Sequence, residues 1–118
     1  MLCLIMIKQT LLDTNFILVC IKQKIDFFEE IPLMGIQIII PEEVIAELEK
    51  LKKNSSLMLL EKSKFKTISL KGKNVDNAII KYAKENPEII IATLDKGIKT
   101  KIKNKKMVIR DRTKLEII

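Results

Sequence analysis

Four acidic residues are the side chains best placed to do chemistry in this chain, and two of them follow apolar segments directly. Asp13 follows the apolar run 10–12, and Asp95 follows the apolar run 89–94. Continuous apolar runs of this kind predict strands that are buried on both faces of a parallel sheet. Because the C-terminal ends of parallel strands meet at one edge, we expect both aspartates to face the crevice where ligands bind. Either aspartate alone would also suit a helix cap or a turn.

Glu47 and Asp76 are the other two acids, and both lie on predicted helices. Of the glutamates in the helix predicted over 42–52, Glu47 lies closest to the apolar arc. A solvent-exposed salt bridge to Lys50 or Lys53 is the alternative role for this side chain. Asp76 falls inside the apolar arc of the helix predicted over 74–85. A carboxylate in a first turn is stabilised by the helix dipole, but an inward-facing charge also needs a partner or a metal ion.

Carboxylates that share a crevice predict a bound divalent cation, because they raise one another's pKa unless a positive charge compensates them. Oxygen-only ligands favour Mg²⁺ or Mn²⁺. A site of this type can activate water and hold a phosphodiester for attack, and it needs no histidine. The chain contains no histidine and no CxxC pair, so a zinc site is not expected.

Strands and helices are predicted to alternate along the 118 residues, which we expect to form a single domain over 1–118. The predicted strands are 10–12, 36–40, 89–94, 107–109 and 115–118. The predicted helices are 15–31 (one or two helices), 42–52, 56–63, 74–85 and 98–103. Alternation of this kind predicts an α/β sandwich with a central parallel sheet.

The composition favours a cytoplasmic protein and excludes an integral membrane protein. Hydrophobic residues make up 47% of the chain and charged residues 31%. The opening apolar run 1–7 is too short to span a bilayer and lacks the features of a signal peptide. It predicts an early strand, or a start codon upstream of the folded domain. Cys3 and Cys20 lie in apolar stretches, where buried free thiols are expected in a reducing compartment.

Basic residues are concentrated directly after Asp95. The segment 96–114 holds nine basic residues and only one acidic residue, a charge of +8 against +7 for the whole chain. We expect this segment to border the crevice and to bind the phosphates of a polyanion such as RNA. A solvated lysine-rich face is the alternative. The residues predicted to bind RNA are Lys96, Lys99, Lys101, Lys103, Arg110 and Arg112.

Four segments of the chain resemble the PIN-domain nucleases, in that family's order and at its usual spacing. The segments are LLDTN at 11–15, PEEVIAEL at 41–48, NVDNAI at 74–79 and IATLDK at 91–96. The resemblance implies a Rossmann-like three-layer α/β/α sandwich whose acidic cluster binds Mg²⁺ or Mn²⁺ and cleaves RNA. Carried over by position, the catalytic and metal-binding acids would be Asp13, Glu47, Asp76 and Asp95. The auxiliary polar residues would be Thr14, Asn15 and Thr93.

Within the family, the segment TLDKGIK at 93–99 and the basic tail look similar to archaeal proteins related to small-subunit rRNA-processing endonucleases. The VapC-type toxins are the close rival. The archaeal rRNA endonucleases that carry a zinc ribbon are excluded, because their cysteines are missing here. RNA is the expected partner; a homodimer and, for a toxin, an antitoxin protein are the protein partners to consider.

Two further classes stay open on the sequence alone. A receiver domain has a similar length and uses aspartates at strand ends, but leucines precede Asp13 where we would expect an acidic pair. A non-catalytic RNA-binding protein with a PIN-like fold would bind RNA without metal-dependent cleavage. Acetyl phosphate labelling would identify the first class, and absence of cleavage the second.

Overall fold

A six-stranded sheet lies at the centre of the computed structural model, which describes residues 8–52 and 54–118. The strand order is β3-β2-β1-β4-β5-β6, and only β6 runs antiparallel to its neighbour. The strands are β1 (Lys8–Leu12), β2 (Ile36–Pro41), β3 (Lys66–Ile68), β4 (Ile90–Ala92), β5 (Lys106–Arg110) and β6 (Lys114–Ile117). The helices are α1 (Thr14–Lys22), α2 (Phe27–Leu33), α3 (Glu42–Lys50), α4 (Asn54–Lys62), α5 (Val75–Glu85) and α6 (Lys96–Lys101).

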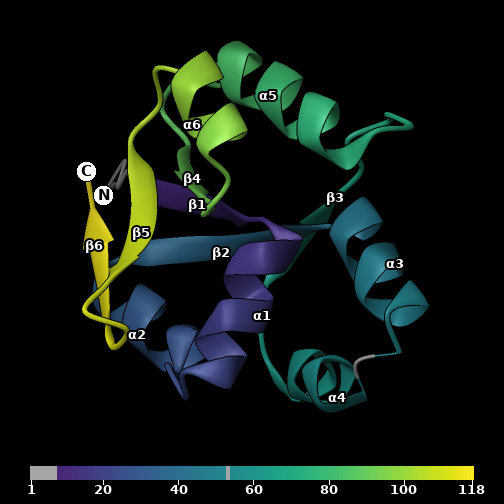
Figure 1. The fold of residues 1–118 in the computed structure, drawn as a ribbon, viewed down its shortest axis with the longest axis vertical. Helices are drawn as coiled ribbons and strands as arrows, with labels where there is room; N and C mark the ends of the chain where they lie inside the picture. The colour runs from purple at the N-terminus through teal and green to yellow at the C-terminus, as the bar shows by residue number, and fades with distance from the viewer. Residues whose placement is uncertain (1–7, 53) are drawn as a thin grey trace, which may run out of the picture.

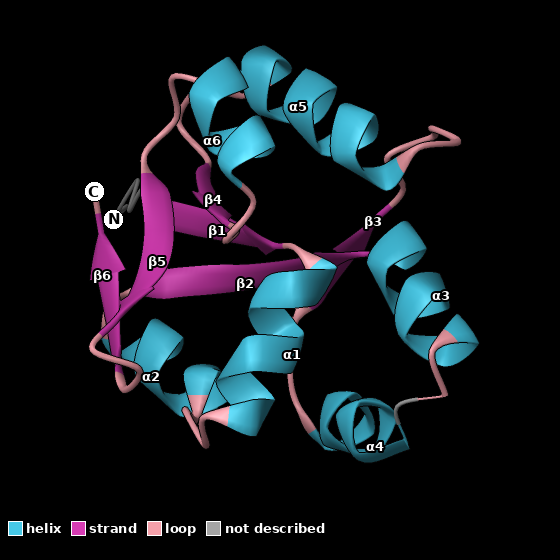
Figure 2. Ribbon diagram, viewed as in Figure 1, coloured by secondary structure: helices cyan, strands magenta, loops and turns pink. Residues whose placement is uncertain are grey.

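Helices cover both faces of this sheet, which makes the predicted three-layer α/β/α arrangement (Figures 1 and 2). Helices α5 and α6 lie on one face, and α1 to α4 lie on the other. Alternate residues of each central strand therefore enter different cores. Leu11, Ile39 and Ile91 pack with α5 and α6. Leu12 and Ile40 pack with the opposite helices. This two-sided burial is why these strands are continuously apolar.

Short polar side chains begin several helices. Asn74 caps α5, as predicted, and its side-chain oxygen accepts a hydrogen bond of 3.0 Å from the Asn77 N–H. Asp26 caps α2 by accepting a bond from the Glu29 N–H. The helical segment predicted over 15–31 is two helices, because Lys24 has a positive φ of 60° that ends the first before Asp26 starts the second.

Two strands depart from the prediction. Strand β3 was not expected, because it is only three residues long and lies at the exposed edge of the sheet. Strand β6 was expected, but not its antiparallel direction. The turn before it holds Asp111 and Arg112 at positive φ. The usual signal of such a hairpin turn is asparagine or aspartate followed by glycine, and here Arg112 follows Asp111 in place of the glycine.

The remaining expectations concern burial and the N-terminal segment. Cys20 is a buried free thiol, as predicted, and loss of hydration raises its pKa to about 12. Cys3 and the strand expected in 1–7 lie outside the described residues. Within the described ranges, no helix combines the length and the apolar character needed to cross a membrane.

Asn104 holds the loop before β4 to the start of β5. Its buried side-chain amide donates to the carbonyls of Asn86 at 3.0 Å and Ile89 at 2.9 Å. We expect Asn104→Ala to lower the free energy of unfolding by about 1–3 kcal/mol, because both carbonyls lose their donor. Urea denaturation measures this loss. The matched variant Asn77→Ala removes an exposed amide and should change stability by less than about 0.5 kcal/mol. Equal losses in the two variants would contradict the assignment.

Candidate active site

The pairing of β1 with β4 sets the position of Asp13. Leu12 is aligned with Ala92, so Asp13 and Thr93 leave the two strands side by side. The Asp13 N–H donates to the Ala92 carbonyl at 3.0 Å, which continues the ladder by one residue. From β1 the chain proceeds outward to β2 and β3 on one side, and to β4 and β5 on the other. Ligands bind at such a switch point, beyond the C-terminal ends of the strands.

The carboxylate of Asp13 is buried, with only 3% of the residue exposed. Its Oδ1 accepts a hydrogen bond of 2.8 Å from the Thr14 N–H and caps α1, and its Oδ2 accepts one of 2.9 Å from the Thr93 hydroxyl. Burial raises the pKa of Asp13 by removing hydration, and the negative charges of Asp76 and Glu47 raise it further. The two hydrogen bonds oppose this rise without cancelling it.

Thr93, rather than Asp95, occupies the strand end opposite Asp13. The strand was expected to continue to residue 94, but β4 ends at Ala92. Because Thr93 points its hydroxyl at Asp13, the same oxygen can accept a 3.1 Å bond from the Asp95 N–H. Thr93 therefore joins two of the predicted acids through one hydroxyl group.

Asp95 lies two residues further along and begins α6. Its Oδ1 accepts from the N–H groups of Gly97 at 2.7 Å and Ile98 at 3.3 Å. A Cβ at position 97 would lie 3.0 Å from this oxygen, so glycine leaves room for the carboxylate. The capping role weighed for Asp95 is thus observed, and its second carboxylate oxygen remains for other contacts.

Glu47 and Asp76 approach from two different helices. Glu47 is half-buried on α3. Asp76 is exposed, which corrects the expectation that it faces the core: burial on α5 begins only at Ala78, one turn after the helix has started. The Asp76 carboxyl still loses part of its hydration, which raises its pKa, and the charges of Asp95 and Glu47 add to the rise.

Electrostatic repulsion links all four acids. Glu47 and Asp76 act on Asp13, and Glu47 and Asp95 act on Asp76. Among residues 8–52 and 54–118, only Arg110 and Glu116 form an ion pair, so no lysine or arginine in these ranges neutralises the four. The salt bridge weighed between Glu47 and Lys50 is absent there, and Lys53 lies outside the described residues. Within the same ranges, no three acidic or thiol side chains converge into a complete metal ligand set.

Two surface cavities beside the acids meet at Asn74. One has a volume of about 340 Å³ and lies between α3 and the segment 72–75, with Glu47 in its wall. The other has a volume of about 180 Å³ and contains Asp76 and Asp95, together with Lys101 from α6. Glu47, Asp76 and Asp95 thus line hollows that a ligand can reach, whereas Asp13 lines neither cavity.

The auxiliary residues have different surroundings. The Thr14 hydroxyl is buried, and it is the one buried side-chain oxygen or nitrogen in the described residues that makes no hydrogen bond. Buried polar atoms are normally paired, so a water or a ligand beside Asp13 would complete this site. Asn15 is exposed on the first turn of α1.

Most of the basic segment does not border the crevice, contrary to the expectation. Lys101 lines the cavity of Asp76 and Asp95. Lys96 and Lys99 lie on the same short helix. Lys103 adjoins Asn104, which binds the loop before β4, so Lys103 lies at the opposite edge of the sheet.

The two arginines of the segment lie at the outer side of the sheet. Arg110 ends β5, two strands from β1, and is paired with Glu116. Arg112 lies in the turn that follows. Because β5 is parallel to β4, Arg110 returns to the C-terminal edge of the sheet, but it lies two strands to the side of Asp13.

Lys50 and Lys73 are the basic residues that do line the cavity of Glu47. Sequence reasoning treated Lys50 only as a salt-bridge partner of Glu47. It gave Lys73 no role in the site. Their signal was available in principle: Lys50 follows Glu47 by three residues on a helix, and Lys73 directly precedes the Asn74 cap of α5.

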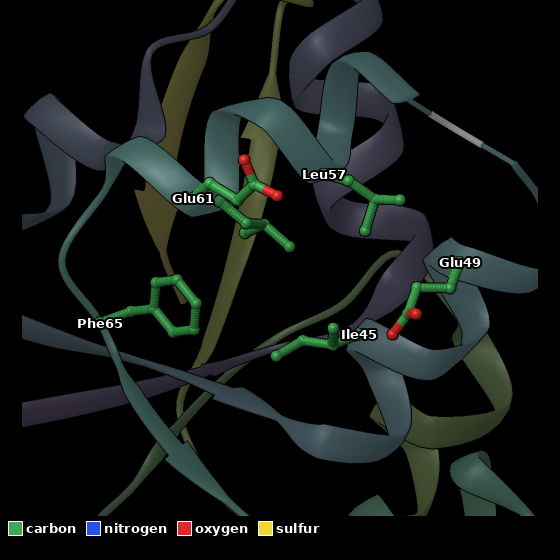
Figure 3. A pocket seen from close by; sticks show the side chains of 6 residues that line it. Ile45, Glu49, Leu57, Glu61 and Phe65 are labelled. Carbon is green, nitrogen blue, oxygen red and sulfur yellow. The ribbon is translucent and has the colours of Figure 1, made fainter.

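A further cavity, of about 360 Å³, lies between α3 and α4 and is separate from the acids described above. Ile45, Leu57 and Phe65 surround it, and Glu49 and Glu61 extend toward it from the two helices (Figure 3). It contains none of the predicted site residues, and Glu49 lies on a different side of α3 from Glu47.

We expect Asp13→Asn to stabilise the protein in EDTA at neutral pH. The folded-state pKa of Asp13 is raised above its ordinary value of 3.8, so ionisation of this group costs stability as the pH rises through the raised pKa. Asparagine is an equally good helix cap and carries no charge. Urea denaturation should show an advantage of Asp13→Asn that is large at pH 7 and shrinks as the pH falls toward 3.8. If the variant is less stable than the wild type at pH 7, the ionised Asp13 carboxylate does not destabilise the fold and the prediction is wrong.

Comparison with known proteins places the chain in a family. A family model described as a PIN-like domain matches residues 10–114. The chain is 34% identical to ribonuclease VapC4 of Methanocaldococcus jannaschii, over 89% of this chain and 92% of that protein. It is 33% identical to the rRNA-processing protein fcf1 of Schizosaccharomyces pombe, over 79% of this chain and 52% of that protein, so it spans about half of the latter.

A solved structure agrees with these sequence matches. The PIN domain endonuclease Utp24 superposes with a TM-score of 0.80 at 26% identity, covering 92% of this chain and 90% of that one. Both the strand order and the sequence matches therefore favour the predicted family over a receiver domain. The chain belongs to the PIN-like domain family.

Proposed function

We propose that this chain is a metal-dependent endoribonuclease that hydrolyses RNA phosphodiester bonds, with Asp13, Glu47, Asp76 and Asp95 as its metal-binding and catalytic residues. The observation that carries the proposal is the buried carboxylate of Asp13, which has no ion-pair partner in the described ranges and whose pKa is raised by burial and by the charges of Asp76 and Glu47. An arrangement that costs stability in this way is expected where function requires it. The ribonuclease and endonuclease names of the relatives support the same activity.

The residues fit a hard divalent cation such as Mg²⁺ or Mn²⁺. Every candidate donor is an oxygen, and the buried Thr14 hydroxyl beside Asp13 lacks a protein partner. Mg²⁺ retains several waters and binds proteins through one or two carboxylates, so it does not require a closed ligand cage. PIN-domain nucleases generally use divalent metal ions, which agrees with this donor set.

The protein side of the reaction follows from the positions of the acids. Thr93 and the Thr14 N–H hold both oxygens of Asp13 in one orientation, so Asp13 is the fixed member of the group. Glu47 on α3 and Asp76 on α5 lie close enough for their charges to raise the pKa of Asp13, and Asp95 is oriented by its own helix cap. A divalent ion bound there would supply positive charge to the phosphodiester and lower the pKa of a water. Thr14, Asn15 and Thr93 are the auxiliary residues, and Lys101 lines the cavity that contains Asp76 and Asp95.

Two biological roles have support from particular relatives. Processing of rRNA is the role named for fcf1, and we favour it because the segment 93–99 resembles rRNA-processing endonucleases. A toxin role is the alternative, since VapC4 aligns with most of this chain and most of its own length. Expression in a host cell distinguishes the two roles, because a toxin arrests growth and copurifies with a cognate antitoxin. A toxin that is a homodimer also gives twice the chain mass by light scattering.

We expect Asp13→Asn and Asp95→Asn to lose RNA cleavage while keeping the fold. Metal-assisted charge stabilisation contributes several kcal/mol, and each 1.4 kcal/mol is a factor of ten, so the rate should fall by about 100-fold or more. Single-turnover cleavage of a labelled single-stranded RNA measures the rate, and circular dichroism checks the fold. Glu49→Gln, on another side of α3, is the matched control and should cleave normally. Undiminished cleavage by either aspartate variant would remove that residue from the site.

Metal dependence should be visible in binding as well as in activity. We expect EDTA to abolish cleavage and Mn²⁺ or Mg²⁺ to restore it. The same ions should raise the melting temperature of the wild type, because they neutralise repulsion that only the folded state contains. Asp13→Asn should show a much smaller rise. A wild-type melting temperature that does not respond to millimolar Mn²⁺ would contradict metal binding, whatever the activity.

A further inference from the structure

Glu43 fastens the segment 69–74, which connects β3 to α5. Both carboxylate oxygens lie 3.0–3.1 Å from the Leu70 N–H, and Oε2 also accepts from the Lys71 N–H at 3.1 Å. The Ser69 hydroxyl adds a longer contact of 3.4 Å. These backbone bonds lower the pKa of Glu43, so the group is ionised and able to accept them at neutral pH. Glu43 lies in the first turn of α3, one helical turn before Glu47.

Gly72 fixes the same segment at a second point. A Cβ at this position would lie 2.8 Å from the Cβ of Ala78, which is buried on α5. Only glycine permits so close an approach between the segment and the helix. The segment is therefore held to α3 by Glu43 and to α5 by Gly72, and the cap residue Asn74 follows two positions later.

The consequence is a walled cavity with two cations. Lys73 on the fastened segment and Lys50 on α3 both line the cavity of about 340 Å³ that also contains Glu47. Neither lysine forms an ion pair with an acidic residue of the described ranges. The wall also carries the carboxylates of Glu43 and Glu47, and that of Glu43 is already bonded to the Leu70 and Lys71 N–H groups. Lys50 and Lys73 are therefore the groups of this wall that can bind an anion lying next to the acids.

We propose that this cavity is a subsite for a backbone phosphate of single-stranded RNA adjacent to the scissile one, with Lys50 and Lys73 as its binding groups and Glu43 as the residue that positions Lys73. The proposal rests on the proposed ribonuclease function, and it adds binding groups to Lys101, the residue of the basic segment 96–114 that lines a cavity of the acids. Phosphate contacts of this type give affinity and register without reading the base sequence.

The test measures RNA binding apart from cleavage. The full chain carrying Asp13→Asn is titrated in Mg²⁺ with a fluorescent single-stranded oligoribonucleotide of mixed sequence at several salt concentrations. We expect Lys50→Gln and Lys73→Gln each to weaken binding severalfold and to reduce the slope of log K against log salt by about 0.7, the value for one phosphate contact on a single strand. Lys22→Gln, at the far end of α1 from Asp13, should change neither quantity. Unchanged slopes in both cavity variants would overturn the subsite.

Glu43→Gln separates positioning from charge, because the two effects predict opposite changes in RNA affinity. Removal of a negative charge near RNA should tighten binding if charge alone matters, whereas loss of positioning should weaken it. We expect weaker binding, faster amide hydrogen exchange at Leu70 and Lys71, and no additional loss when Glu43→Gln is combined with Lys73→Gln. Glu42→Gln, an exposed acid on the same turn, is the matched control and should not weaken binding. Binding by Glu43→Gln as tight as that of the control would overturn the positioning role.

The outcomes also separate this inference from the proposed function. Lysine-dependent RNA binding by a protein whose wild type never cleaves RNA would contradict the nuclease and leave the subsite standing. Cleavage by the wild type with no effect of Lys50→Gln or Lys73→Gln would leave the nuclease standing and remove the subsite. Because both lysines are exposed, their variants are expected to fold, so neither result depends on the stability of Glu43→Gln.

Discussion

The burial of one carboxylate at the junction of β1 and β4 is the constraint on which the rest of this structure depends. Parallel pairing of Leu12 with Ala92 leaves Asp13 only 3% exposed, so its oxygens depend on hydrogen bonds from neighbouring protein groups. The Thr14 N–H serves one oxygen and the Thr93 hydroxyl serves the other. Because Thr93 also accepts from the Asp95 N–H, the same small network orients the start of α6.

This network holds an anion in place without neutralising it. Hydrogen bonds from neutral donors favour the ionised form of Asp13, but burial and the nearby acids disfavour it more strongly. In proteins, ion pairs with lysine or arginine usually relieve repulsion between carboxylates. In the described ranges, no ion pair includes Asp13 or the acids near it. A cation that binds here would remove the repulsion and stabilise the folded state. This stabilisation links the unfavourable burial of Asp13 to the proposed metal chemistry.

Two different elements carry the lysines that are proposed to contact RNA. Helix α6 brings Lys101 to the cavity of Asp76 and Asp95, while the segment 69–74 brings Lys73 to the cavity of Glu47. The hydrogen-bonded start of α6 places Lys101, and backbone bonds to Glu43 place Lys73. Asp95 caps the helix that carries Lys101, and Glu43 binds the segment that carries Lys73, so the cations and the acids are positioned by the same elements.

Local chemistry determined most of what the sequence predicted correctly. Continuous isoleucine-rich runs indicated buried parallel strands, Asn74 indicated the start of α5, and the family segments identified the fold. Tertiary structure alone decided the exposure of Asp76 and the place of Lys103. The exposure of Asp76 depends on where α5 meets the sheet. The place of Lys103 depends on which edge of the sheet the chain reaches after α6. Residue spacing encodes neither. The same holds for Glu43, whose partners lie 27 and 28 positions away and become neighbours only when β3 pairs with β2.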